Sequence, residues 1–111
     1  MMLDNAVPAS LSGKAFVQAV MGRTIDDGPR IHVWFFGSSI SFYINMAKDP
    51  RVFAEALEPP HPDQIQSWAC APGWFVEKIS GDKIRVGLGG MVITLSPAEC
   101  KRLAQNIRQV L

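Results

Sequence analysis

The last third of the chain alternates short apolar segments with tight-turn dipeptides, and this pattern predicts a run of strands. Apolar and β-branched residues are frequent at positions 73–79, 83–88 and 91–95, and the dipeptides Gly81-Asp82 and Gly89-Gly90 separate these segments. Two-residue connections that contain glycine are typical of β-hairpins, which join antiparallel neighbours. We therefore expect three antiparallel strands in succession.

A helix is predicted after these strands because its first turn carries several start signals together. Ser96 stands at the N-cap position, Pro97 at the first helical position, and Glu99 completes a capping box with Ser96. Leu95 and Cys100 match the two positions of a hydrophobic staple. The apolar residues of the helix are spaced by three or four: Cys100, Leu103, Ala104, Ile107 and Leu111. This spacing indicates an amphipathic C-terminal helix.

Two more helices are predicted earlier in the chain. Ser10 or Ser12 can cap a first helix, whose apolar residues run from position 15 to position 21. Asp49 caps a second one, with Pro50 at its first position. Its expected inner face is formed by four apolar residues: Val52, Phe53, Ala56 and Leu57. Prolines at positions 59, 60 and 62 end that helix, and we expect residues 1–9 to be irregular.

The segments between the helices favour strands. Residues 31–36 are rich in β-branched and aromatic types, and Gly37-Ser38 can form a two-residue turn before a partner strand at 40–46. Residues 40–47 also fit a helical spacing, but their β-branched and aromatic content favours the strand. Residues 65–71 are predicted to form a further strand, followed by a turn at Pro72-Gly73.

This order of elements predicts the α+β class: an antiparallel β-sheet of about five to six strands with helices packed on it and an amphipathic helix at the C-terminus. Parallel pairing would need long crossover connections that the chain does not have. The 111 residues are enough for a single domain with one core, and no internal repeat is evident. The sequence leaves open whether the helices cover one face of the sheet or both.

The hairpin at Gly81-Asp82 predicts a register for its two strands. A two-residue loop pairs Ile79 with Ile84, and the pairing continues along both strands. This register turns Phe75 and Ile79 toward the core. The opposite face then carries a tryptophan, a valine and three cations: Trp74, Val76, Lys78, Lys83 and Arg85. Lys78 and Arg85 would lie directly across from each other.

That opposite face gives one hypothesis for function, the binding of single-stranded nucleic acid. It offers an aromatic ring for stacking on a base and cations for the phosphates. Its candidate binding residues are Trp74, Lys78, Lys83 and Arg85. Residues 78–111 carry a net charge of +4, against −3 for residues 1–77, which agrees with an affinity for polyanions. The simpler alternative is the solvent-exposed side of a one-sided sheet.

Residues 74–111 also resemble a known family. The strands, the Gly-Gly-Met-Val-Ile-Thr-Leu-Ser-Pro-Ala-Glu segment at 89–99 and the amphipathic helix are similar to the end of the positive-cofactor-four type of single-stranded-DNA-binding coactivators. The resemblance implies a curved antiparallel sheet, a C-terminal helix and a dimer interface. The two helices expected earlier in the chain depart from that family's compact plan.

The composition favours a different hypothesis, a small non-enzymatic interaction module. Hydrophobic residues make up 48% of the chain and charged residues 19%, which is apolar for a domain of this size. A buried homodimer interface would account for the apolar excess. Consecutive strand side chains point to opposite faces, so the aromatic residues cannot all be buried on one side. The contact candidates are Trp34, Phe36, Trp74 and Val76.

This interaction module is the function that the sequence favours. Its expected partner is a second copy of the chain, another protein, or both. No apolar run approaches 18 residues, so we expect no membrane span, and the start of the chain lacks the pattern of a secretory signal. We therefore expect a cytoplasmic location.

An enzyme is the third hypothesis. His32 and His61 are the only histidines, and catalytic groups could gather around either one in the fold. Cys70 and Cys100 both lie in apolar surroundings typical of small buried side chains. Asp26-Asp27 precedes Gly-Pro and is predicted to form a turn. The chain has no phosphate-binding loop and no metal-ligand spacing, so we expect no cofactor and no metal ion.

Overall fold

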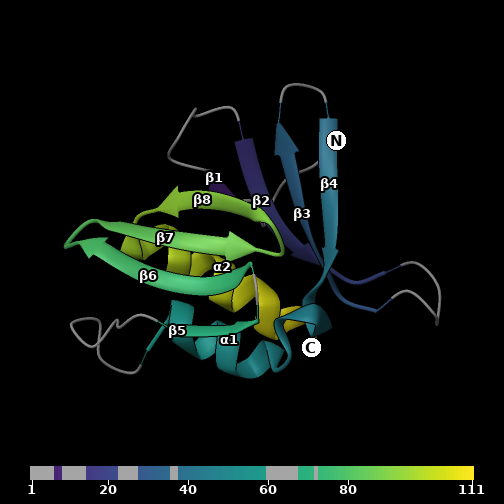
Figure 1. Cartoon of the computed structure of the whole chain (residues 1–111). Helices are drawn as coiled ribbons and strands as arrows, with labels where there is room; N and C mark the ends of the chain where they lie inside the picture. The colour runs from purple at the N-terminus through teal and green to yellow at the C-terminus, as the bar shows by residue number, and fades with distance from the viewer. Residues whose placement is uncertain (1–6, 9–14, 23–27, 36–37, 60–67, 72) are drawn as a thin grey trace.

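The described residues form two antiparallel β-sheets and three helical segments (Figure 1). The computed structural model describes residues 7–8, 15–22, 28–35, 38–59, 68–71 and 73–111. Sheet 1 contains, in chain order, β1 (Val7–Pro8), β2 (Ala15–Val20), β3 (Arg30–Phe35) and β4 (Ser38–Tyr43). Sheet 2 contains β5 (Trp68–Ala71), β6 (Trp74–Ser80), β7 (Lys83–Leu88) and β8 (Met91–Leu95). The helical segments are the 3-10 helix η1 (Ile44–Ala47) and the α-helices α1 (Pro50–Leu57) and α2 (Pro97–Val110).

The α+β class and the C-terminal helix are confirmed. The prediction of one sheet of about five to six strands is wrong, because the described strands divide into two sheets of four. Both η1 and α1 follow β4 in the chain, and β5 then begins a second sheet on the other side of the molecule (Figure 1). All neighbouring strands in both sheets are antiparallel, as the tight turns predict.

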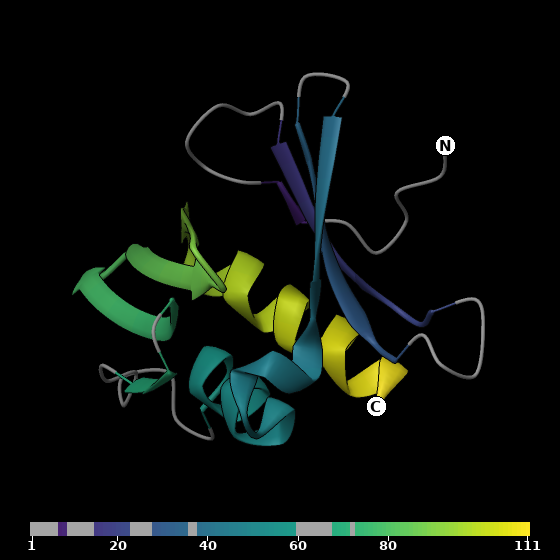
Figure 2. The same ribbon diagram turned by 45° about the vertical axis from the view of Figure 1, so that its right-hand side comes forward.

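Helix α2 is the central element of the fold. It contacts β1 and β2 of sheet 1, β7 and β8 of sheet 2, and α1. Figure 2 shows α2 crossing the molecule between sheet 1 and α1. The buried side chains of both sheets and of all three helical segments form one hydrophobic cluster around it. The inner face of each sheet is therefore the one that packs toward the helices.

The same order of elements occurs twice in the chain. Three antiparallel strands followed by a helix form a first unit, β2–β3–β4 with α1, and a second unit, β6–β7–β8 with α2. The middle strands begin alike, with a buried isoleucine and a buried valine after a cation: Arg30-Ile31-His32-Val33 and Lys83-Ile84-Arg85-Val86. The sequence showed no evident repeat, but the structure shows a repeated plan.

The helix of each unit packs on a strand of the other unit. Helix α2, which belongs to the second unit, packs on β2 of the first unit, and α1 of the first unit packs on β6 of the second. Each sheet therefore buries its inner face partly against the helix of the other unit.

The prediction of a helix over residues 15–21 is wrong, because residues 15–20 form β2. Val17 and Ala19 are buried, whereas Phe16, Gln18 and Val20, which alternate with them, are only partly buried; this is the two-residue period of a strand. The segment is apolar at nearly every position and fits either period, and pairing with β3 decides the outcome. Residues 10 and 12, the predicted caps, lie outside the described residues, as do 1–6 and 9; Val7 and Pro8 form β1.

The segment at 40–46 combines the two alternatives that the sequence allowed. It is strand up to Tyr43 and 3-10 helix from Ile44 to Ala47. Ser38 pairs with Phe35 inside the sheet and belongs to β4, so its predicted place in a turn with Gly37 is wrong; Gly37 lies outside the described residues. Ile44 and Ala47 are fully buried, which anchors the end of β4 to the core.

The helix predicted after Asp49 is confirmed. The Asp49 carboxylate accepts hydrogen bonds from the N–H groups of Arg51 and Val52, and Pro50 takes the first position. The buried side chains of this helix are Phe53, Ala54 and Leu57. Val52, expected on the inner face, is exposed instead.

The register predicted for the β6–β7 hairpin is wrong by one residue. Gly81 and Asp82 form the turn, as expected, but the pairing shifts between Lys78 and Ser80. This β-bulge gives β6 one extra residue, and a shift of one residue exchanges the two faces of a strand. Trp74 and Val76 consequently point into the core, and Ile79 is 52% exposed.

We expect Ser96→Ala to lower the free energy of unfolding by about 1 kcal/mol. The Ser96 hydroxyl accepts a hydrogen bond from the Glu99 N–H at 3.2 Å, and the Glu99 carboxylate accepts one from the Ser96 N–H at 2.7 Å. Urea denaturation measures the change. Gln109→Ala, at an exposed position of α2, is the control and should change stability by less than about 0.5 kcal/mol. Equal stability of Ser96→Ala and the parent protein would contradict this role of the cap.

Candidate functional site

The outer face of sheet 1, on the side away from α2, gathers aromatic and polar side chains. Ile31 and Val33 of β3 are buried on the inner face, so the residues that alternate with them point outward. The strand register then defines the outer face of sheet 1 from β2, β3 and β4: Phe16, Gln18, Val20, Arg30, His32, Trp34, Ser39, Ser41 and Tyr43. All nine are at least partly exposed.

A stack of two rings lies at the centre of this face. The imidazole of His32 and the indole of Trp34 lie with their centroids 5.1 Å apart and their planes within 17° of parallel. They are two residues apart on β3, which places their side chains on the same face. The His32 Nδ1 atom and the Ser41 Oγ atom are 2.8 Å apart, across the β3–β4 pair. The stack and the hydrogen bond together restrict the rotamers of both rings.

The surroundings of His32 favour its neutral form. Partial burial, and to a lesser extent the positive charge of Arg30, lowers the pKa of His32 from its ordinary value. Both causes act against the protonated imidazolium. The outer face therefore favours an uncharged imidazole. Its Nδ1 atom either accepts a hydrogen bond from the Ser41 hydroxyl or donates one to the hydroxyl oxygen, depending on the tautomer.

Arg30 and Tyr43 form a second fixed pair at the other end of the face. The Arg30 guanidinium donates a hydrogen bond to the Tyr43 hydroxyl at 2.6 Å, and its central carbon lies 4.5 Å from the centroid of the same ring. A cation over the face of an aromatic ring is attracted by the ring's quadrupole. Arg30 is therefore held against the sheet, and the outer face combines one cation with three aromatic rings and an imidazole.

A hydroxyl beside an imidazole can also be the start of a catalytic pair. Such a pair uses a third group that orients the imidazole and a concave site for the substrate. Among the described residues, His32 has Ser41 and Trp34 as its partners and no carboxylate. The pair also lies on the face of a sheet and not in a cavity. The described residues therefore supply the hydroxyl and the imidazole of such a pair but not its third group.

The residues predicted to bind nucleic acid are not brought together. Trp74 is 2% exposed and packs edge-on against Phe42 and Phe53, with ring centroids 6.3 and 5.5 Å apart. It therefore lies on the inner face of sheet 2, where it cannot stack on a base. Arg85 pairs across the sheet with Glu77, not with Lys78, and its guanidinium lies 2.9 Å from the Glu77 carboxylate.

The outer face of sheet 2 instead carries Phe75 and Glu77 of β6, with Lys83 and Arg85 of β7. The ring of Phe75 lies directly over Gly87, the residue that it faces on β7. Lys83 is exposed near the turn of the hairpin, as is Lys78. The bulge thus replaces the tryptophan on this face by a phenylalanine, and it places Glu77 beside Arg85, whose charge it neutralises.

Of the four predicted contact residues, Trp34 is the one that the structure places on an accessible face. It is partly exposed at the centre of the outer face of sheet 1. Trp74 and Val76 are buried in the core of the chain. Phe36 lies outside the described residues.

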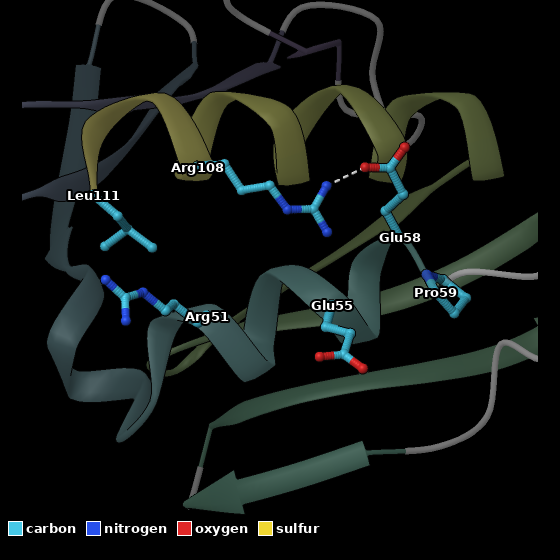
Figure 3. Close-up of a pocket in the computed structure, with 6 residues that line it drawn as sticks. All are labelled: Arg51, Glu55, Glu58, Pro59, Arg108 and Leu111. Atoms are coloured by element: carbon cyan, nitrogen blue, oxygen red, sulfur yellow. Dashed lines mark hydrogen bonds and ion pairs between the residues drawn. The ribbon is translucent and has the colours of Figure 1, made fainter.

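The described residues of α1 and α2 and of the segments that follow them form a groove (Figure 3). It has a volume of about 680 Å³ and is lined by Arg51, Glu55, Glu58, Pro59, Arg108 and Leu111. Arg108 and Glu58 form an ion pair across it, and Figure 3 shows Arg51 and Leu111 at its other end. Ligand pockets enclose most of the surface of a bound molecule. This groove is open, carries two arginines and two glutamates, and does not include His32 in its lining.

The remaining chemical candidates do not form a site in the described part of the chain. Burial, and to a lesser extent the Glu99 carboxylate, raises the pKa of the Cys100 thiol to about 12, so the thiol stays protonated and inert at neutral pH. No group of three or more potential metal ligands occurs among the described residues. His61, Asp26 and Asp27 lie outside those residues. None of the described helices is both long and apolar enough to cross a membrane.

Comparison with known proteins adds no relative. No protein-family model, no curated protein and no solved structure matches this chain.

Proposed function

We propose that the protein is a non-enzymatic interaction module that forms a homodimer through the β3–β4 hairpin, residues 30–35 and 38–43. The main support for this proposal is that the hairpin exposes large side chains on both of its faces. Trp34 and Tyr43 lie on the outer face, and Ile40, on the inner side of β4, is still 37% exposed. Apolar surface of this kind marks contact sites when it is contiguous.

The residue types on the hairpin support this proposal. Tryptophan, tyrosine and arginine are the types that dominate the binding energy of protein interfaces. Trp34 is held by its stack on His32, and Arg30 by its hydrogen bond to Tyr43. Side chains fixed in advance lose less entropy when a partner covers them. The high apolar fraction of the chain agrees with a further surface that is buried on association.

The two other functions have weaker support. A protein that binds single-stranded nucleic acid needs unpaired cations beside an aromatic ring that can stack on a base. Here Arg85 is paired with Glu77, and Trp74 is buried. An enzyme needs a concave site around its acid–base group, and His32 lies on a sheet face. A cytoplasmic location stays a prediction from the sequence.

Sedimentation equilibrium over a concentration series tests the homodimer. We expect a mass approaching twice the 12.2 kDa of the chain, and a fall toward the monomer on dilution. Trp34→Ala should raise the dimer dissociation constant at least tenfold, since it removes the largest contact residue of the hairpin. The control is Val92→Ala on β8, which removes an exposed apolar side chain from the other sheet. A monomer at all concentrations, or an unchanged dissociation constant for Trp34→Ala, would overturn the proposal.

A further inference from the structure

The two edges of sheet 1 differ in how they are protected. In the described part of the chain the edge strand β1 comprises Val7 and Pro8, and proline is a device that keeps sheet edges from pairing with other chains. The opposite edge, β4, is six residues long and contains neither proline nor a charged residue. Its sequence, Ser-Ser-Ile-Ser-Phe-Tyr, lacks the lysines that natural monomers place on exposed edges.

The backbone of β4 is also regular. It pairs with β3 over all six residues, from Phe35–Ser38 to Arg30–Tyr43, without a shift of register. In an antiparallel strand, alternate residues direct their N–H and C=O groups away from the neighbour that they already bond. Among the described residues no strand pairs with the other side of β4, which therefore offers an uninterrupted row of backbone donors and acceptors. Sheet 2, in contrast, has bulges in both the β5–β6 and the β6–β7 pairs.

The other regular edge strand, β8, is held more tightly by the core. Ile93 and Leu95 are buried, and the strand runs directly into the capped start of α2. In β4, five of the six side chains are exposed, and Phe42 is the exception. Among the described edges, β4 is thus the one that combines length, regularity and exposure.

From these observations we infer that the free edge of β4 binds the β4 strand of a second copy, antiparallel and across a two-fold axis. Sheet 1 of one copy and sheet 1 of the other then join into one continuous sheet of eight strands. This inference rests on the proposed function, because it specifies how the two hairpins meet in the homodimer.

A second copy fits this edge better than a charged partner strand does. Around a two-fold axis every residue of β4 faces another residue of β4, so a charged residue would meet a like charge nearby. The absence of charge from all six positions removes that cost. On the outer face, Ser39 and Ser41 are small, which leaves room beside the seam for the Trp34 rings of both copies.

Cysteine cross-linking tests the strand pairing directly. Single cysteines are placed in turn at positions 38 to 41 in a Cys70→Ser background, and mild oxidation follows; Cys100 is buried and stays in place. A disulfide needs Cα atoms about 4.4–6.8 Å apart, so the residue next to the two-fold axis should cross-link at least tenfold more than its neighbours. Gln18→Cys places a cysteine on the outer face of β2. It should form a cross-link if the outer faces of sheet 1 from the two copies pack against each other.

The outcomes separate this inference from the proposed function. Cross-linking confined to one position of β4 supports the strand pairing. Cross-linking at position 18, with none on β4, overturns the strand pairing but leaves the homodimer in place. A monomer in sedimentation overturns both.

A lysine on the edge gives a second test that needs no oxidation. Ser39→Lys should raise the dimer dissociation constant at least tenfold, because it adds the like charge that natural edges use against pairing. The control is Gln109→Lys, which adds the same charge at an exposed position of α2. Circular dichroism checks that both variants fold. Equal dissociation constants for the two lysine variants would overturn the inference, and should Ser39→Lys fail to fold, the cross-linking pattern decides.

Discussion

Trp74→Ala is expected to lower the free energy of unfolding by about 3–5 kcal/mol, the range for removing a large aromatic side chain from a core. Trp74 lies where three parts of the fold meet. It belongs to β6 of sheet 2 and packs edge-on against Phe42 of sheet 1 and Phe53 of α1. Alanine would leave a cavity between both sheets and the helix, and the surrounding rings could only partly fill it.

The matched control is Ile79→Ala on the same strand. Ile79 is 52% exposed at the bulge, so its truncation should cost less than about 1 kcal/mol. The register predicted from the two-residue turn would reverse this order, since it places Ile79 in the core and Trp74 outside. Urea denaturation of the two variants therefore tests the bulge itself. A larger loss for Ile79→Ala than for Trp74→Ala would contradict the structure of sheet 2.

Gly73→Ala is expected to lower the free energy of unfolding by about 2 kcal/mol or more. Gly73 has φ +85°, a conformation that side chains other than glycine's rarely adopt. A Cβ atom there would lie 2.7 Å from the Gly90 backbone nitrogen, which is closer than real contacts allow. The Gly73 carbonyl also accepts a hydrogen bond of 2.9 Å from the Gly89 N–H. Both the start of β6 and the β7–β8 turn would have to move.

Gly81→Ala is the control for this substitution. Gly81 is exposed in the β6–β7 turn, and a Cβ atom there would meet no atom within 4 Å. We expect its effect on stability to be within about 0.5 kcal/mol. Thermal denaturation of both variants measures the difference. A Gly73→Ala protein as stable as Gly81→Ala would show that the close approach of Gly73 and Gly90 does not occur.

The parts of the fold that follow from short stretches of sequence were predicted well. Ser96, Pro97 and Glu99 mark the start of α2, and Asp49 with Pro50 marks the start of α1, because a cap satisfies backbone groups within a few residues. The turns at Gly81-Asp82 and Gly89-Gly90 are equally local. These elements need no knowledge of the rest of the molecule.

The wrong predictions concern segments whose structure is determined by contacts with residues far away in the sequence. The apolar positions of residues 15–20 fit both the two-residue period of a strand and the spacing of a helix. Only the pairing of these residues with β3 makes them a strand. The bulge at Ile79 leaves no mark on the hydrophobic pattern, yet it reverses the faces of β6. The division into two sheets depends on where α1 and α2 pack, which no single segment contains.

Two residues of the candidate site were named from the sequence, Trp34 as a contact residue and His32 as a group around which catalytic residues could gather. The signal for the rest was present in the alternation of residues 30–34, where Ile31 and Val33 separate Arg30, His32 and Trp34. Such a pattern indicates one buried face and one face of aromatic and polar groups. The partners Ser41 and Tyr43 required the register of β4, which the prediction of Ser38 as a turn residue did not give.

The exchange of helices between the two units has a consequence during protein synthesis. Strands β2 and β3 leave the ribosome before α2, which covers the inner face of β2 and follows every other described element in the chain. The apolar side chains of Val17, Ile31 and Val33 are therefore not fully covered until residues 97–110 have emerged. Until then the nascent chain exposes apolar surface that favours aggregation, and the time of exposure is set by the rate of translation between β3 and the end of α2.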